Sequence, residues 1–246
     1  MSAIVAKFGG SSLANTPNIK KVKQIIDADP DRKIIVVSAP GRRDELDHKI
    51  TDQLLNVAKR FCAIERGFGL DPVAGHYLAS RGEYMMAKYL AKILGFLFVD
   101  IESSGIVCFD KNGDVDLVKS AANFKKFKGK NIVVPGFYGL RADGEVVTFS
   151  RGGSDISGAI LANIADAKLY ENWTDVDGVY DQNPSKYSKA KKYTTLSYDL
   201  AQDLAAKGAN VLHPDCIEFV KQKNIPIEIK NTFAPHLKGT VISKEG

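Results

Sequence analysis

Short apolar runs alternate along the chain with longer stretches in which apolar residues recur at helical spacing. Ile4–Phe8 and Lys33–Val37 are short, mainly apolar runs, a pattern typical of strands covered on both faces of a sheet. Thr16-Pro17 begins a predicted helix between them, because proline favours the first helical position and apolar residues then recur up to Ile26. The start of the chain therefore predicts a strand, a loop, a helix and a second strand.

The same alternation continues to the end of the chain. The pattern predicts helices at 50–66, about 72–94, 197–207 and from 213, and strands at 96–101, 132–134, 146–149, 168–173 and 226–229. Gly82 is unfavourable inside a helix, so the sequence predicts a junction between two helices at Arg81–Glu83. No long linker, repeat or low-complexity tract interrupts the alternation. We expect one α/β unit, with a largely parallel sheet between helical layers.

A glycine-containing motif, Thr148–Asp155, precedes a predicted helix with an apolar face. Its two glycines would let a backbone approach a ligand, and a helix N-terminus presents unpaired N–H groups to an anion. Ser154 and Asp155 are candidates for the N-cap region, and the Arg151 guanidinium suits a carboxylate or phosphate. The motif predicts a site for a small anionic ligand. Taken alone, it is explained equally well by a tight turn with an exposed arginine.

A second glycine loop follows the first strand. Gly9-Gly10 and Ser11 separate that strand from the next helix, an arrangement that can hold phosphates with backbone N–H groups. Lys7 precedes the glycines, so the loop is not a Walker A motif, and alone it is a weak signal. Ser38–Gly41 and Gly136–Gly139 are predicted to form similar turns after two further strands.

Three further positions have polar groups of interest. Glu83 stands among small and apolar residues, so its carboxylate is predicted to be partly buried and to need either a ligand ammonium or a structural salt bridge. Thr174–Tyr180 follows a predicted strand, and its acidic and hydroxyl groups suit a ribose or base; a simple loop is the alternative. His213, before a proline, is predicted to start a helix rather than to act in catalysis.

Composition narrows the class of protein. Of 246 residues, 44% are hydrophobic and 26% charged, as in soluble globular proteins, and no secretory or membrane-spanning pattern is present. The three cysteines are far apart, which indicates a reducing compartment without a cysteine-based metal site; we expect a cytoplasmic protein. The net charge is +5, but the lysine runs lack a binding motif or interleaved aromatics, so no nucleic-acid or membrane partner is expected.

Taken together, the motifs resemble the catalytic region of aspartokinases, within the amino acid kinase family. The matching segments follow one another along essentially the whole chain: Lys7–Ser12, Ser38–Gly41, Ser80–Tyr84, Ser150–Asp155, Thr174–Tyr180, Gly208–Pro214 and Ile229–Thr232. The Thr174–Tyr180 segment is similar to one in glutamate and carbamate kinases. The pair formed by Lys7–Ser12 and Ser150–Asp155 is much more particular to aspartokinases.

The resemblance implies a three-layer αβα sandwich over residues 1–246, with an N-terminal half that binds the amino acid and a C-terminal half, about 150–246, that binds ATP. It implies phosphorylation of the side-chain carboxylate of L-aspartate, with ATP and Mg²⁺, to 4-phospho-L-aspartate and ADP. That reaction is the first step towards lysine, threonine and methionine. We expect a homodimer without C-terminal ACT domains. Inhibition through such domains on this chain is therefore not expected.

The resemblance also assigns residues to the amino-acid and phosphoryl sites. Lys7 and Asp155 would be catalytic, with Asp155 orienting Lys7. Glu83 would pair with the substrate ammonium and Arg151 with its α-carboxylate. Further residues would line the substrate pocket: Ser38, Thr51 and Ser154.

For the nucleotide, the resemblance implies that the phosphates are held by Lys7, Gly9, Gly10 and Ser11. The rest of the nucleotide would be contacted by Thr174, Asp175 and Tyr180. Mg²⁺ would be bound mainly to ATP, with no protein metal ligand. The attacking carboxylate has a pKa of about 3.9 and is ionised at neutral pH, so no general base is needed.

Two positions depart from the aspartokinase pattern. Many aspartokinases have lysine where this chain has Asn210, and arginine where it has Ser185. Lys207 or Lys186 could substitute for the missing charge, and this stays a hypothesis.

Three alternative functions are considered. A kinase of another small acid, such as glutamate or carbamate, is disfavoured by the Ser150–Asp155 motif. A non-catalytic amino-acid or nucleotide sensor is disfavoured because Lys7, Glu83, Arg151 and Asp155 are all retained. An RNA-binding protein is the most remote, since only the lysine runs point to it.

Overall fold

The computed structural model describes residues 3–70, 74–150, 152–182, 184, 187, 189–206 and 212–246. The strands are β1 (Ile4–Phe8), β2 (Arg32–Val37), β3 (Leu97–Phe98), β4 (Ile132–Pro135), β5 (Tyr138–Leu140), β6 (Val146–Thr148), β7 (Leu169–Thr174), β8 (Thr195–Ser197), β9 (Ile227–Asn231) and β10 (Thr240–Ser243). The α-helices are α1 (Thr16–Asp27), α2 (Ile50–Gly67), α3 (Ala74–Leu94), α4 (Ile101–Ser104), α5 (Leu117–Phe124), α6 (Gly153–Ile164), α7 (Tyr198–Ala206) and α8 (Pro214–Lys221).

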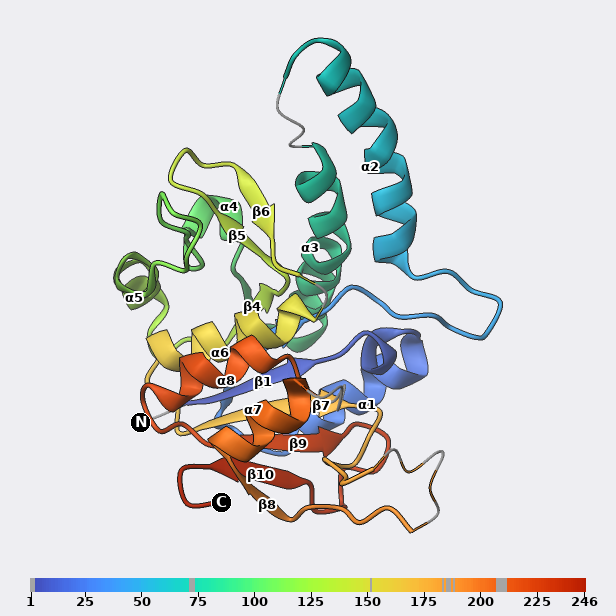
Figure 1. Ribbon diagram of the computed structural model, residues 1–246, viewed down its shortest axis with the longest axis vertical. Helices are drawn as coiled ribbons and strands as arrows, with labels where there is room; N and C mark the ends of the chain where they lie inside the picture. Colours follow the sequence, from blue (N-terminus) through green and yellow to red (C-terminus); the bar gives the residue numbers. More distant parts are fainter. Residues whose placement is uncertain are drawn as a thin grey trace.

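Eight strands form one sheet in the order β3-β4-β2-β1-β7-β9-β10-β8, and each neighbouring pair is parallel except β9 and β10. β1 runs through the middle of the molecule (Figure 1). The strand register places Lys7 of β1 beside Val36 of β2 and Asn172 of β7. The predicted largely parallel sheet is therefore confirmed, and its central strands bring Lys7 and Asn172 together.

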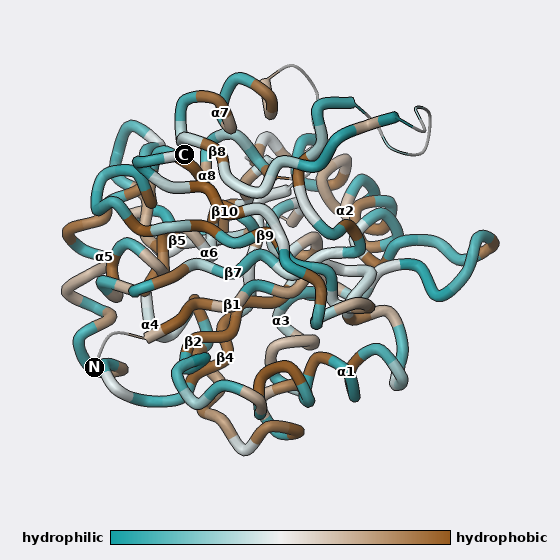
Figure 2. Tube along the Cα trace, turned by 90° about the horizontal axis from the view of Figure 1, so that it is seen from below, coloured by the Kyte–Doolittle hydropathy of each residue, from teal (hydrophilic) through white to brown (hydrophobic). Residues whose placement is uncertain are grey.

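Helices cover both faces of this sheet, as Figures 1 and 2 show. One core contains residues of α5, α6, α7 and α8, and the other contains residues of α1 and α3. Neighbouring residues of β1 belong to different cores: Val5 packs with α6, whereas Ala6 and Phe8 pack with α1. The arrangement is the predicted three-layer αβα sandwich. Since side chains alternate along a strand, Lys7 points to the same side as Val5, towards α6.

α2 and the N-terminal part of α3 form a helical hairpin that projects from the sandwich, while the C-terminal part of α3 packs in the core (Figure 1). α2 buries only Ala58, so most of its surface faces solvent or the neighbouring helix. No helix in the described ranges is long and apolar enough to cross a membrane.

The hairpin of β5 and β6 differs from the prediction. The predicted strand at 146–149 is present as β6, but it pairs with β5 and not with the main sheet. The turn expected at Gly136–Gly139 is shorter, because Phe137 adopts a φ of 78° and β5 begins directly afterwards at Tyr138. The tight turn at Phe137 reverses the chain and separates this hairpin from β4.

Other segments also differ from the predicted elements. Of the strand predicted at 96–101, only Leu97–Phe98 pairs with β4, because Asp100 caps α4 and turns the chain into a helix. β8 and β10 are short edge-side strands without a strong apolar pattern, and the sequence did not predict them. The predicted end of the helix at Lys207 and Gly208 lies outside the described residues.

α3 continues without a break through Gly82, so the predicted junction at Arg81–Glu83 is wrong. A Cβ at Gly82 would lie 2.7 Å from the Cβ of Ala39 and 3.3 Å from Cγ2 of Ile50. Glycine is therefore required for the close packing of α3 against the loop after β2. This packing outweighs the low helix propensity of glycine.

We expect Gly82→Ala to destabilise the protein, although alanine is the better helix former. Alanine would favour the helix by about 1 kcal/mol, whereas overpacking against Ala39 costs about 1–3 kcal/mol. Chemical denaturation should therefore show a loss of up to about 2 kcal/mol in the free energy of unfolding. Gly67→Ala is the matched control, because no atom lies within 4 Å of its Cβ position. An equal loss in both variants would contradict the packing argument.

Candidate functional site

A buried ion pair joins the central strand to the first turn of α6. The Nζ atom of Lys7 lies 2.6 Å from Oδ1 of Asp155, and both side chains are almost fully buried. Asn172 lies beside Lys7 on β7; its Nδ2 donates to Oδ1 of Asp155 over 3.1 Å, and its Oδ1 accepts from Lys7 Nζ over 3.4 Å. The three side chains form one network, which holds the lysine ammonium at a fixed position. The implied orientation of Lys7 by Asp155 agrees with this contact.

Asp155 also accepts hydrogen bonds from residues outside this network. The backbone N–H of His213 donates to Oδ2 of Asp155 over 3.3 Å, and the Tyr170 hydroxyl donates to the Asp155 carbonyl oxygen over 3.1 Å. The prediction that Ser154 and Asp155 cap α6 is wrong: the N-cap is Gly152, with a φ of 83° and no side-chain cap. The carboxylate of Asp155 is unavailable as a cap because it binds Lys7, Asn172 and His213.

His213 links the start of α8 to the loop before α6. Its Nδ1 accepts the backbone N–H of Asp215 over 3.2 Å, so Nε2 carries the proton of the neutral ring and donates to Ser150 Oγ over 3.0 Å. A Cβ at Gly152 would lie 3.1 Å from Cδ2 of His213. His213 is the N-cap of α8, and its predicted role at the start of a helix is confirmed.

The glycine loop after β1 packs against the loop after β2. The Gly9 N–H donates to the Trp173 carbonyl over 3.0 Å, and the Gly41 N–H donates to the Gly10 carbonyl over 2.8 Å. A Cβ at Gly10 would lie 2.9 Å from the Ala39 carbonyl oxygen, so this close approach of two backbones requires glycine. Ser11 begins a short 3₁₀ turn, Ser11–Leu13. The predicted phosphate-binding loop thus lies at the carboxyl end of the central strand.

Lys7 is close to this loop. Its Nζ lies 3.7 Å from the position that a Cβ on Gly9 would occupy. A cation next to glycine N–H groups is an arrangement that can bind phosphate oxygens.

Glu83 is a buried carboxylate with an unsatisfied oxygen. Its exposed fraction is 4%, it accepts the backbone N–H of Ala39, and its Oε2 has no hydrogen-bond partner among the described residues. Burial raises the pKa of Glu83 to about 7, and the hydrogen bond from Ala39 only partly opposes this. No described Lys, Arg or His forms an ion pair with Glu83, so the structural salt bridge that the sequence left open is not found in this part of the chain.

Ala39 connects Glu83 with the glycine loop. Its N–H binds Glu83, and its carbonyl oxygen faces Gly10. The Glu83 carboxylate and the glycine loop therefore both lie next to Ala39, one at its N–H and the other at its carbonyl group. An amino acid whose ammonium binds Glu83 would have its other end near the phosphate-binding loop.

Three residues expected to line the substrate pocket lie on separate elements of the fold. Ser38 follows β2 and donates its backbone N–H to the Phe8 carbonyl over 3.1 Å. Ser154 is buried in the first turn of α6, where its Cβ would be 2.8 Å from a Cβ on Gly136. Thr51 is half-buried in the first turn of α2, between residues that contact Gly82. Arg151, the expected partner of the α-carboxylate, lies outside the described residues.

The expected nucleotide residues follow β7. The Thr174 hydroxyl donates to Oδ1 of Asp175 over 3.1 Å, and Asn231 Nδ2 donates to the Asp175 carbonyl over 3.2 Å. The Tyr180 hydroxyl donates to Oδ1 of Asp177 over 2.9 Å. The segment is thus an ordered turn at the carboxyl end of β7, next to the glycine loop, whose Gly9 N–H donates to the Trp173 carbonyl.

Sequence reasoning missed several residues of this region. Asn172 has no predicted role beyond its place in a strand, although a polar amide in a strand covered on both faces is a visible signal. Asp177 was assigned to the segment without a role; its Oδ2 lies 3.1 Å from Lys192 Nζ, and this pair lowers its pKa against the effect of burial. No pattern in the sequence indicated Lys192, because its contact with Asp177 is tertiary.

Comparisons with known proteins show the family of this chain. The model of the amino acid kinase family matches residues 2–231. Aspartokinase 3 of Bacillus subtilis is 34% identical to this chain, over 98% of this chain and 63% of the relative. The aspartokinase of Rickettsia felis is 31% identical, over 100% of this chain and 62% of the relative. The chain spans a little under two thirds of the length of these relatives.

Solved structures show the same fold. The aspartate kinase of Clostridium acetobutylicum has a TM-score of 0.84 and 38% identity, covering 99% of this chain and 63% of that chain. Aspartokinase III of Escherichia coli, solved in complex with aspartate and ADP, has a TM-score of 0.84 at 23% identity, covering 98% and 64%. Uridylate kinase of Archaeoglobus fulgidus has a TM-score of 0.59 at 21% identity, covering 98% and 100%, which shows the fold alone. The match of the family model over most of the chain shows that this protein belongs to the amino acid kinase family.

Proposed function

We propose that this chain transfers the γ-phosphoryl group of ATP to the side-chain carboxylate of L-aspartate, giving 4-phospho-L-aspartate and ADP. The observation that carries the proposal is the buried Lys7–Asp155 ion pair next to the glycine loop. The similarity to aspartokinases supports it, since one of the similar structures is solved with aspartate and ADP.

The proposed amino-acid site is built around Glu83. Its partnerless Oε2 matches the charge of a substrate ammonium, and binding such a cation removes the penalty for ionising a buried carboxylate. Arg151 would bind the α-carboxylate, and the site would be lined by Ser38, Thr51 and Ser154. The residues N-terminal to about 150 supply most of this half of the site.

The proposed nucleotide site combines the start of the chain with its C-terminal half, about 150–246. The phosphates would be bound by Lys7, Gly9, Gly10 and Ser11. The Gly9 N–H already donates to the Trp173 carbonyl, so Gly10 and Ser11 would supply the backbone N–H groups, and Gly9 would let a phosphate approach the backbone closely. The remainder of the nucleotide would be contacted by Thr174, Asp175 and Tyr180. Asn210 and Ser185, which depart from the aspartokinase pattern, lie outside the described residues.

Catalysis in this proposal is positioning and charge neutralisation. The aspartate carboxylate is already ionised, so the protein has to hold two anions together and stabilise charge on the transferred group. Lys7 does so through an ammonium that Asp155 and Asn172 hold in place. Mg²⁺ would accompany ATP, bound to phosphate oxygens, and would neutralise part of their charge.

A hydroxylamine trap tests the proposed function. The chain is incubated with ATP and Mg²⁺ together with aspartate, glutamate, carbamate or no acceptor, and acyl phosphate is measured as hydroxamate. For carbamate, whose product is not an acyl phosphate of this kind, ADP release is measured. We expect hydroxamate with aspartate only, and none without Mg²⁺. Product with glutamate or carbamate instead would identify a different acceptor. ATP binding without turnover on any acceptor would overturn the kinase proposal.

We further propose that the protein is a cytoplasmic homodimer, on the basis of its resemblance to aspartokinases. Sedimentation equilibrium gives the assembly directly. A mass near the 26.8 kDa of one chain, independent of concentration, would contradict the dimer.

A further inference from the structure

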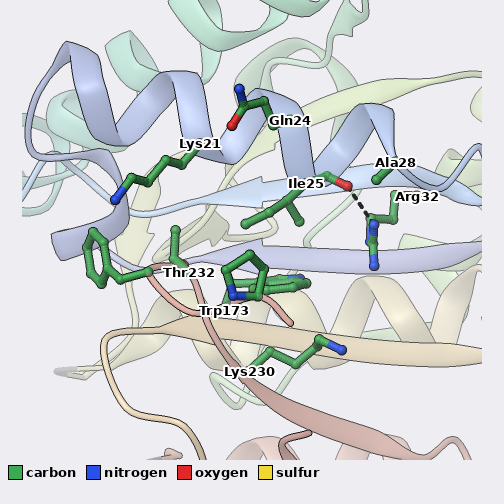
Figure 3. A pocket seen from close by; sticks show the side chains of 10 residues that line it. Lys21, Gln24, Ile25, Ala28, Arg32, Trp173, Lys230 and Thr232 are labelled. Atoms are coloured by element: carbon green, nitrogen blue, oxygen red, sulfur yellow. Dashed lines mark hydrogen bonds between the residues drawn. The ribbon is translucent and has the colours of Figure 1, made fainter. Parts of the chain in front are cut away.

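A pocket of about 390 Å³ lies between α1 and the strands β7 and β9, as Figure 3 shows. It is on the α1 side of the sheet, whereas Lys7 points to the α6 side. The pocket is therefore distinct from the phosphoryl site. Its lining consists of Lys21, Gln24, Ile25, Ala28, Arg32, Trp173, Lys230, Thr232, Phe233 and Pro235.

Among the described residues, the lining contains three cations and no acidic residue. Two of the cations are neutralised by carboxylates that do not line the pocket. Arg32 pairs with Glu171 at 2.7 Å, and Lys230 pairs with Glu228 at 3.0 Å. Lys21 has no carboxylate partner among the described residues. One unbalanced positive charge remains, so the charge of the pocket matches a monoanion.

The rest of the lining is mainly apolar and aromatic, with Gln24 and Thr232 as its uncharged polar residues. Trp173 is buried at the bottom of the pocket: it is 1% exposed, its ring stacks on Phe8 with centroids 6.0 Å apart, and Lys230 Nζ lies 5.2 Å from its ring centre. Phe233, 39% exposed, lies at the side where Lys21 enters, with Lys21 Nζ 5.3 Å from the centre of its ring. A flat apolar group would contact the exposed Phe233 ring while an attached anion reaches the Lys21 ammonium.

We propose that this pocket binds a small aromatic monoanion, with its ring against Phe233, above the buried Trp173, and its anionic group on Lys21. Arg32 and Lys230 add to the positive field, but their carboxylate partners limit what they contribute. A neutral molecule of the same shape binds less tightly, because it leaves the Lys21 charge without a partner.

The pocket is joined to the glycine loop by two hydrogen bonds. The Thr232 and Ser12 hydroxyls lie 2.7 Å apart, and the Trp173 carbonyl accepts the Gly9 N–H. A ligand that moves Thr232 or Trp173 therefore changes the position of the loop. If the proposed function is correct, occupancy of this pocket changes the KM for ATP; the binding site itself does not depend on that function.

Trp173 is the only tryptophan of the chain, so its fluorescence reports occupancy of this pocket. We would titrate the protein with benzoate and with benzamide, which share a shape but not a charge, and correct for quenching with free N-acetyltryptophanamide. Benzoate is expected to bind roughly fivefold more tightly than benzamide, the factor of an exposed ion pair. Lys21→Gln should remove this difference.

Two further variants complete the test. Lys23→Gln is the matched control, because Lys23 is on the same helix, pairs with Asp27 and does not line the pocket. It should keep the preference for benzoate. Gln24→Phe should fill the pocket and weaken both ligands. Equal binding of the two ligands to the unaltered protein, or a preference for benzoate that survives in Lys21→Gln, would overturn the proposal whether or not the chain has kinase activity.

Discussion

Replacing Lys7 with methionine is expected to lower kcat for aspartate phosphorylation by about 100- to 1,000-fold, the usual loss when one preorganised charge at a transition state is removed. The ammonium of Lys7 lies beside the glycine loop and is fixed by Asp155 and Asn172. It is therefore placed to stabilise charge on the transferred phosphoryl group. Steady-state kinetics at saturating ATP and aspartate measure this loss.

In Lys7→Met, a loss of folding stability must be distinguished from a loss of catalysis. Methionine would leave the buried Asp155 carboxylate without its cation, which costs about 3–5 kcal/mol in the free energy of unfolding. The double variant Lys7→Met/Asp155→Asn removes both charges and should recover much of this stability while staying inactive. Recovery of near-normal turnover in the double variant would show that Lys7 acts only in folding, and the proposed mechanism would be wrong.

Glu83→Gln is expected to raise the KM for aspartate by about 30-fold or more, because it removes one partner of a buried charge pair. Its effect on kcat should be smaller, since Glu83 contacts the ammonium and not the reacting atoms. Glu83→Asp keeps the charge on a shorter side chain and should be affected less than the glutamine variant. A larger effect of Glu83→Gln on kcat than on KM would contradict the assignment.

The raised pKa of Glu83 predicts the pH dependence of aspartate binding. With a pKa of about 7, the free protein has a neutral Glu83 below that pH, and a neutral carboxyl cannot pair with an ammonium. The value of kcat/KM for aspartate should therefore fall about tenfold for each pH unit below this pKa. This limb should be absent in Glu83→Gln, and a pH profile of both proteins checks it.

The raised pKa of Glu83 also predicts that the free energy of unfolding depends on pH, in the opposite direction to aspartate binding. The folded-state pKa of about 7 exceeds the ordinary value of 4.5, so between these pH values the folded state binds more protons than the unfolded state. The free energy of unfolding should fall as the pH rises through this window, by about 3 kcal/mol in total. Glu83→Gln should lack this dependence. Denaturant titrations of both proteins at pH 4.5 and 8 measure it.

Much of the fold could be predicted because its signals are local. β1 and β2 are apolar runs, and α1 has a proline at its start. All three elements fall within two residues of the predicted limits. The glycine loop and the Thr174–Tyr180 segment were placed at strand ends by the same alternation. In a parallel sheet the ends of neighbouring strands meet at one edge, so the general position of the site followed from the order of elements.

Elements with weak local patterns could not be predicted. β8 and β10 are short, and their pairing depends on partners distant in the chain. The helix break expected at Gly82 is absent because Ala39, more than forty residues earlier, occupies the space that a side chain would need. Helix propensity describes one residue in isolation, and a tertiary contact reversed its prediction here.

By itself the sequence determined the class of fold, the glycine loops and, through its resemblance to aspartokinases, the residues to examine. Only the tertiary structure decided their contacts: that Asn172 completes the Lys7–Asp155 network, that Glu83 is buried with one oxygen unpaired, and that Lys21 and the single tryptophan line one pocket. Burial and ion pairing depend on which distant segments pack together. Spacing along the chain carries no direct information about that packing, and the chemistry of the site depends on it.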